Sequence, residues 1–182
     1  KTVTIFIGST RVPSNSSGIS SWVKYHINKT YNNIHINEIS PIHPYNLVSI
    51  PINSMPPKAI KDPINYDNNV ITQYANDIIH SSLLIFIVPV YNHSYPGGFK
   101  IMIDHLLNEF SNKPVLIIAH GPSAPQVVAE LTKKLCEKLQ MNIVGMISIK
   151  IPKHYVSEPT TRVSMEYSED NPDLVTDSFL QV

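Results

Sequence analysis

The fold is constrained most by a regular alternation between short apolar runs and apolar residues at helical spacing. Five short, largely apolar runs predict strands at residues 3–7, 34–39, 83–88, 115–119 and 143–149. Between them, apolar residues recur every three or four positions and predict helices at residues 19–27, 70–79, 99–110 and 127–139. Strands that alternate with helices in this way are typical of an α/β domain, in which helices cover both faces of a parallel sheet.

The number of strands indicates their order in the sheet. Five parallel strands with right-handed crossovers suit the flavodoxin-like order 2-1-3-4-5. In that order the winding reverses between the first and third strands, and open α/β sheets bind ligands at such a switch point, outside the carboxyl ends of the strands. We therefore expect a ligand to contact the loops that follow residues 7, 88 and 119.

The length of 182 residues favours a single domain. We predict a flavodoxin-like domain over residues 1–152 and a polar C-terminal extension over residues 153–182, in which the apolar spacing allows a short helix at 174–180. Residues 40–66 are rich in Pro and Asn and predict a long irregular loop, of a kind that is usually functional.

Charge and cysteine content exclude several classes of partner and compartment. The chain carries 14 basic and 14 acidic side chains, scattered along the sequence, which predicts no nucleic-acid partner and no anionic membrane surface. No apolar run approaches the roughly 20 residues that a membrane helix needs. Cys136 is the only cysteine, which fits a reducing compartment. Because the sequence opens directly into a strand, without a signal-like region, we expect a cytoplasmic protein.

The loop at residues 89–100 has the composition of a ligand-binding loop. Tyr91 and Tyr95 offer flat rings, Asn92 offers amide hydrogen bonds, and Gly97-Gly98 frees the backbone to turn into the next helix. A planar heteroaromatic ligand suits such a loop better than a metal or a peptide. An ordinary strand-to-helix turn is the alternative that this loop alone leaves open.

The loop at residues 8–18 has the composition of a phosphate site. It combines four serines and Arg11 with the start of a helix, where free backbone amides favour anions. The alternative is a helix-capping turn that uses Ser17. That alternative accounts for one serine, so we favour phosphate binding.

Other motifs exclude several site chemistries. The sequence has neither the phosphate loop of nucleoside-triphosphate hydrolases nor the glycine pattern of dinucleotide folds, and its histidines show no metal-ligand spacing, so no metal site is expected. Cys136 lies in a predicted helix, which excludes a phosphatase-like cysteine loop. His93 and His120 could contact a ligand, although exposed loop positions are the simpler expectation. Asp104 and His105 are expected on the solvated face of the third helix.

Together, these segments resemble the NADPH-dependent FMN reductases, which include flavodoxin-like quinone and azo-dye reductases. The matching segments are Gly8-Ser9-Thr10-Arg11, Pro89-x-Tyr91-Asn92 with Tyr95-Pro96, Lys100 and Asp104, Lys113-Pro114-Val115, and residues 141–152. The resemblance covers residues 3–152 in order, and its last segment is most similar to fungal members. It implies bound FMN, NADPH or NADH as the reductant, a small-molecule electron acceptor and a homodimer.

The resemblance also implies a cofactor site, position by position. The residues implied to hold the FMN phosphate are Ser9, Arg11, Ser16, Ser17, Gly18 and Ile19. The isoalloxazine and ribityl groups would contact Pro89, Val90, Tyr91 and Asn92, with Tyr95 nearby, and the pyrimidine end would face His120 and Gly121. No side chain is expected to act as an acid, base or nucleophile, because a bound flavin carries the chemistry.

Two departures from the family pattern leave two functional hypotheses. Val90 stands where the family has a glutamate, and Pro122, which donates no amide hydrogen, stands where relatives have a glycine pair. The first hypothesis is an FMN-dependent NAD(P)H oxidoreductase that passes hydride through bound flavin to quinones, azo compounds or free flavin. The second is a flavodoxin-like protein with weak or lost flavin binding that acts through a protein partner.

Overall fold

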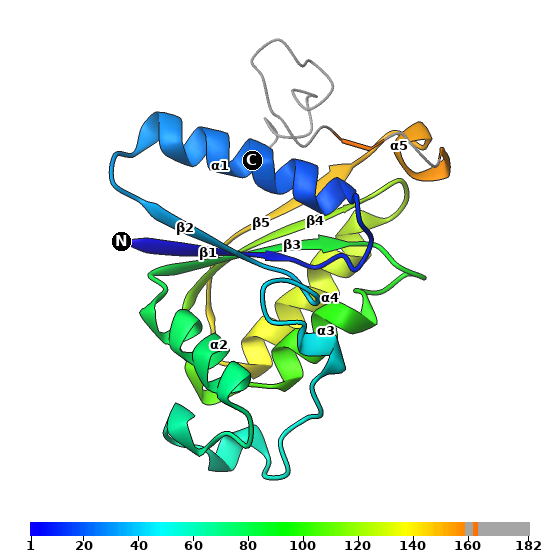
Figure 1. Ribbon diagram of the computed structural model, residues 1–182. Helices are drawn as coiled ribbons and strands as arrows, with labels where there is room; N and C mark the ends of the chain where they lie inside the picture. Colours follow the sequence, from blue (N-terminus) through cyan, green and yellow to red (C-terminus); the bar gives the residue numbers. More distant parts are fainter. Residues whose placement is uncertain (159–161, 164–182) are drawn as a thin grey trace.

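The computed structural model describes residues 1–158, 162 and 163, and within them it confirms the predicted sheet (Figure 1). The five strands are β1 (Thr2–Ile7), β2 (His35–Ile39), β3 (Leu83–Pro89), β4 (Pro114–Gly121) and β5 (Asn142–Lys150). All neighbouring strands pair in parallel, in the order β2-β1-β3-β4-β5. The switch point therefore lies between β1 and β3, as the sequence predicts.

Helices cover both faces of this sheet. The helices are α1 (Asn15–Thr30), α2 (Asn69–His80), α3 (Gly97–Asp104), α4 (Pro125–Lys138) and the short α5 (His154–Ser157). Helix α1 lies on one face, whereas α2, α3 and α4 lie on the other (Figure 1). Because side chains alternate along a strand, Ile5 packs toward the α1 face and Phe6 toward the opposite face, and both are fully buried. No helix in the described part of the chain is long and apolar enough to span a membrane.

Residues 40–66 form an irregular loop, as predicted, but the loop is packed against the core. It contains three short 3-10 helices, and its side chains Leu47, Ile60 and Tyr66 are buried. The Tyr66 hydroxyl donates to Glu109 Oε1 at 2.8 Å, and Glu109 Oε2 accepts from the Leu107 amide at 3.2 Å. Burial and the neighbouring Glu109 carboxylate together raise the pKa of Tyr66 well above its usual value. This hydrogen bond ties the loop to the chain beyond α3.

Removal of that tie should destabilise the protein. We expect Tyr66→Phe to lower the free energy of unfolding by about 1.5–3 kcal/mol, because the buried carboxylate of Glu109 loses a donor. Urea unfolding followed by circular dichroism measures the change. Tyr31→Phe removes a hydroxyl from a side chain that is 62% exposed and is the matched control. Equal unfolding midpoints for the two variants would show that the Tyr66 hydrogen bond does not contribute to the free energy of unfolding.

Helix α3 and the residues after it differ from the prediction. The predicted helix over residues 99–110 ends at Asp104 and is followed by a 3-10 turn at Asn108–Phe110. Asp104 is exposed, as expected, and it pairs with Lys100. The expectation for His105 is wrong. His105 is buried, and its Nε2 donates to the Leu47 carbonyl oxygen at 2.9 Å, because the loop at residues 40–66 covers it. The short helix α5 was not predicted, and residues 174–180 lie outside the described residues.

Candidate functional site

A cavity opens at the carboxyl ends of β1, β3 and β4, where the three loops were expected to meet. It is open to solvent, and the space between its walls, part of it open solvent, is about 390 Å³. Most of the predicted site residues line it, namely Ser9, Arg11, Ser16, Pro89, Val90, Tyr91, His120 and Gly121. The other predicted residues, Ser17, Gly18, Ile19, Asn92 and Tyr95, are described but are not among its lining residues. The fold therefore brings the three predicted loops together, but some of the residues assigned to the site do not line the cavity.

The loop after β1 contributes a polar cluster around Tyr91. Ser9 Oγ lies 2.9 Å from the Tyr91 hydroxyl and accepts from the Arg11 amide at 3.1 Å. The Arg11 guanidinium lies over the Tyr91 ring, 4.6 Å from its centroid. Gly8 is required just before this cluster, because a Cβ there would lie 2.9 Å from the Ile87 carbonyl oxygen. The exposed Arg11 thus places a positive charge at the mouth of the cavity.

The start of α1 is capped by Ser14 rather than by Ser17. Ser14 Oγ accepts from the Ser17 amide at 3.1 Å and lies 2.9 Å from Ser17 Oγ. Ser16 points to the other side, and its Oγ lies 2.8 Å from His120 Nε2. Ile19 is fully buried in the core between α1 and the sheet, so its side chain is not available to a ligand in the cavity.

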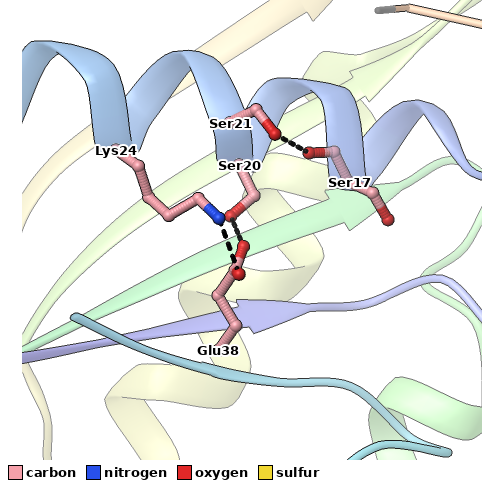
Figure 2. A network of polar contacts seen from close by, with 5 residues as sticks. All are labelled: Ser17, Ser20, Ser21, Lys24 and Glu38. Atoms are coloured by element: carbon pink, nitrogen blue, oxygen red, sulfur yellow. Dashed lines mark hydrogen bonds and ion pairs between the residues drawn. The ribbon is translucent and has the colours of Figure 1, made fainter. Parts of the chain in front are cut away.

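Ser17 lines a second, solvent-open hollow between α1 and the end of β2. Beside it, Glu38 Oε1 accepts from Ser20 Oγ at 2.5 Å and Glu38 Oε2 pairs with Lys24 Nζ at 2.7 Å (Figure 2). Ser21 Oγ donates to the Ser17 carbonyl oxygen at 3.2 Å. The Ser21 contact lies within α1, whereas the two contacts of Glu38 join α1 to β2. They also neutralise the Glu38 carboxylate, which would otherwise repel an anion at the start of α1.

The loop after β3 is a tight turn. The Tyr91 and Ser94 amides donate to each other's carbonyl oxygens at 2.8 and 2.9 Å. Asn92 and His93 between them have φ angles of 49° and 60°, as in a type I′ turn. Both side chains are exposed, which confirms the expectation for His93. The turn therefore presents Asn92 at the surface beside the cavity.

The prediction that Gly97-Gly98 turns the backbone is wrong. Neither glycine has a positive φ, and both lie in the first turn of α3. Gly98 is required for close packing instead, because a Cβ there would lie 2.5 Å from Thr10 Cγ2 and 3.1 Å from Pro41 Cβ. Gly98 thus allows α3 to lie close to the loop after β1, whereas a Cβ at Gly97 would meet no atom within 4 Å.

The end of β4 overturns the simpler expectation for His120. This residue lies in the strand and is only 2% exposed. Burial lowers the pKa of its imidazole to about 3, so the ring is neutral at physiological pH. The His120 carbonyl oxygen accepts from the Val90 amide at 2.9 Å, so that amide is already engaged. Gly121 fits closely against Val90, since a Cβ there would lie 2.8 Å from Val90 Cγ2.

The chain beyond β5 forms a wall of the cavity that the sequence did not indicate. Tyr155, Val156 and Arg162 line it. Asn15, at the start of α1, holds this segment from two sides: its Nδ2 donates to the Tyr155 carbonyl oxygen at 3.0 Å, and its Oδ1 accepts from the Val163 amide at 2.9 Å. These contacts join residues about 140 positions apart, so no local pattern could have revealed them.

We therefore expect Asn15 to stabilise the segment beyond β5 that lines the cavity. We expect Asn15→Ala to raise amide hydrogen exchange at residues 153–158 roughly tenfold or more, because two hydrogen bonds of about 1 kcal/mol each are lost. Hydrogen–deuterium exchange with mass spectrometry measures it. The same substitution at Asn76, exposed on α2, is the control. Unchanged exchange in Asn15→Ala would show that the wall is held by other contacts.

Among the described residues, no group of three or more His, Cys, Asp or Glu side chains is arranged to hold a metal ion. The donor groups that line the cavity include the hydroxyl groups of serines and Tyr91, the side-chain amide of Asn15 and the guanidinium groups of Arg11 and Arg162. Such donors suit an anionic or polar organic ligand.

Comparisons with known proteins identify the family. The family model of the NADPH-dependent FMN reductases matches residues 2–155. The NAD(P)H-dependent FMN reductase LOT6 of Saccharomyces cerevisiae is 27% identical over 96 residues, which are 53% of this chain and 50% of LOT6. This chain therefore matches about half the length of that relative.

Solved structures share the fold. The flavoenzyme NAD(P)H:(acceptor) oxidoreductase FerB of Paracoccus denitrificans superposes with a TM-score of 0.60 at 20% identity, over 93% of this chain and 81% of FerB. The flavodoxin of Megasphaera elsdenii superposes with a TM-score of 0.53 at 8% identity, over 81% of this chain and 85% of the flavodoxin. These likenesses, with the strand order, show a flavodoxin-like fold. With the family model matched along almost all of the described residues, the chain belongs to the NADPH-dependent FMN reductase family.

Proposed function

We propose that this protein is an FMN-dependent NAD(P)H oxidoreductase whose flavin binds in the cavity at the carboxyl ends of β1, β3 and β4. The observation that carries the proposal is the position of Arg11, Ser9 and Ser16 around the start of α1 at that edge of the sheet. A helix start with hydroxyl donors and a guanidinium suits a phosphate monoester. The phosphate end of FMN therefore fits the residues present.

The remaining loops would hold the other parts of the cofactor. Tyr91 and the Pro89-Val90 backbone line the cavity beside the phosphate residues, and the Asn92 amide lies in the exposed turn. Since the Val90 amide already binds the His120 carbonyl oxygen, Asn92 is the better donor to a flavin ring. Tyr95 packs edge-on against Phe99, with ring centroids 5.9 Å apart, and this contact joins the loop after β3 to α3.

Bound FMN would supply the redox chemistry, accepting hydride from NADPH or NADH and passing electrons to an acceptor. The protein's own residues would bind and orient the cofactor, and Val90 and Ile151 supply apolar parts of the cavity wall. We propose a quinone, an azo compound or free flavin as the acceptor, and a homodimer as the assembly. Turnover of NADPH or NADH with menadione, an azo dye or added FMN tests the acceptor, and sedimentation equilibrium tests the assembly.

Arg11 should contribute strongly to FMN binding. We expect Arg11→Gln to weaken FMN binding about tenfold or more, because a charged hydrogen-bond donor to the phosphate is lost, and to leave riboflavin binding nearly unchanged. Quenching of flavin fluorescence measures both affinities. Lys133→Gln, on the exposed face of α4, is the control. Equal weakening of FMN and riboflavin would show that Arg11 does not meet the phosphate.

A second candidate function rests on the third loop. Pro122 lines the cavity and offers no amide hydrogen, and the Gly121 carbonyl oxygen is engaged by the Ile151 amide at 3.0 Å. A loop with so few free polar backbone groups would suit a flavodoxin-like protein that binds flavin weakly and acts through a protein partner. Absence of NADPH turnover in protein with bound FMN would favour this second candidate.

A further inference from the structure

The contact between Ser16 and His120 joins two elements that are 104 residues apart in sequence. Ser16 Oγ lies 2.8 Å from His120 Nε2, and both residues line the cavity. Ser16 is fully buried and His120 is 2% exposed, so bulk water does not satisfy their polar atoms. The hydrogen-bond direction between these two groups therefore decides what Ser16 can offer to a ligand.

The protonation of the ring follows from its surroundings. His120 is neutral, because burial lowers its pKa to about 3, and a neutral imidazole carries one N–H. Nδ1 is buried and has no hydrogen-bond partner among the described residues. Orphaned buried N–H donors are rarer than under-satisfied acceptors. The proton therefore lies on Nε2, which donates to Ser16 Oγ.

This direction leaves the hydroxyl proton of Ser16 free to donate elsewhere. The neighbouring hydroxyl groups have hydroxyl partners within the protein, since Ser14 Oγ lies 2.9 Å from Ser17 Oγ and Ser9 Oγ lies 2.9 Å from the Tyr91 hydroxyl. A buried hydroxyl whose oxygen already accepts a hydrogen bond needs an acceptor for its own proton. At the start of α1 the favoured acceptor is an anion.

We propose that His120 is a positioning residue that holds the Ser16 hydroxyl as a donor toward the phosphate of the cofactor. The inference rests on the proposed function, and it concerns selection of the phosphorylated flavin over riboflavin. His120 acts through Ser16 and does not itself touch the ligand in this arrangement. His120 thus contributes to binding of the FMN phosphate, whereas the family resemblance implies that it faces the pyrimidine end of the flavin.

Two amide substitutions separate this role from simple packing. The amide nitrogen of glutamine is as many bonds from Cβ as His Nε2 is, whereas that of asparagine is as close as Nδ1. His120→Gln should therefore keep the donor to Ser16, and His120→Asn should lose it. We expect His120→Asn to weaken FMN binding about tenfold and riboflavin binding less than about twofold, with His120→Gln close to the parent protein. Flavin fluorescence quenching gives all four affinities.

Two further variants complete the test. Ser16→Ala should show the same selective loss, and the double variant Ser16→Ala/His120→Asn should show no additional loss, because the two residues act as one unit. His105→Asn is the matched control, since His105 is also buried with Nε2 bonded and Nδ1 without a partner among the described residues, but it does not line the cavity. It should leave the ratio of FMN to riboflavin affinity unchanged.

The outcomes are distinct. A change in the affinity ratio shared by Ser16→Ala and His120→Asn, and rescued by His120→Gln, supports the proposal. Equal loss for both flavins, additive losses or an unchanged ratio would overturn it while leaving the proposed function intact. Failure of the parent protein to bind either flavin would overturn the proposed function and this inference with it. Should His120→Asn unfold by circular dichroism, Ser16→Ala decides: an unchanged affinity ratio in that variant overturns the proposal.

Discussion

Acidification to about pH 4.5 is expected to cost roughly 2–3 kcal/mol of folding stability through His120 alone. In the folded protein, burial lowers the pKa of this imidazole to about 3, whereas a histidine in the unfolded chain titrates near about 6.5. Between these two values the unfolded state binds a proton that the folded state does not. The stabilisation is therefore complete above the unfolded pKa and is lost as the pH falls toward the folded one.

The measurement is urea unfolding across this pH range for the parent protein and for His120→Gln, whose side chain does not titrate. His105 is also buried, and burial lowers its pKa, so it acts in the same direction. Both proteins retain His105 and the same carboxylates, so their difference isolates His120. We expect the parent protein to lose more stability than the variant on acidification. Parallel curves would mean that His120 is protonated in the folded state or exposed to water.

Truncation of Phe6 is expected to have the largest effect on stability. Phe6 is the penultimate residue of β1 and is fully buried. Its ring centroid is 4.8 Å from that of Phe86 and 6.2 Å from that of Tyr74. Phe6→Ala should lower the free energy of unfolding by about 3–5 kcal/mol, because transfer free energy is lost and a cavity remains. Such a loss is a large fraction of the stability of an ordinary domain.

Differential scanning calorimetry or urea unfolding measures this loss. The control is Ile64→Ala, since that side chain is 75% exposed and its truncation should change stability by less than about 0.5 kcal/mol. Similar stability in the two variants would contradict the burial of Phe6 in the core. Since β1 leads directly into Gly8 and Ser9, Phe6→Ala should also weaken any ligand binding at the start of α1.

Sequence patterns predicted the sheet because its signals are local. Each strand is a short apolar run, and each crossover helix shows its own apolar stripe, so the order of the strands and the meeting of three loops followed. The end of α3 could not be predicted in this way. The apolar residues at 106, 107 and 110 continue the stripe, but they pack in a turn that contacts the loop at residues 40–66.

The candidate site was predicted less completely than the fold, because its contacts are non-local. His120 looked like a loop residue, since nothing near it in sequence reveals the contact with Ser16. Asn15 and Arg162 gave no signal, because their roles depend on the chain beyond β5 folding back onto α1. Ile19 matched a family position, yet helical periodicity directs its side chain into the core.

The most direct test of the central claim is a titration of the purified protein with FMN, followed by flavin fluorescence and absorbance. We expect saturable quenching at about micromolar FMN, weaker binding of riboflavin, and loss of that preference in Arg11→Gln and Ser16→Ala. Binding that saturates equally for both flavins would contradict a phosphate site at the start of α1. No quenching by either flavin would contradict the oxidoreductase itself and favour a role through a protein partner.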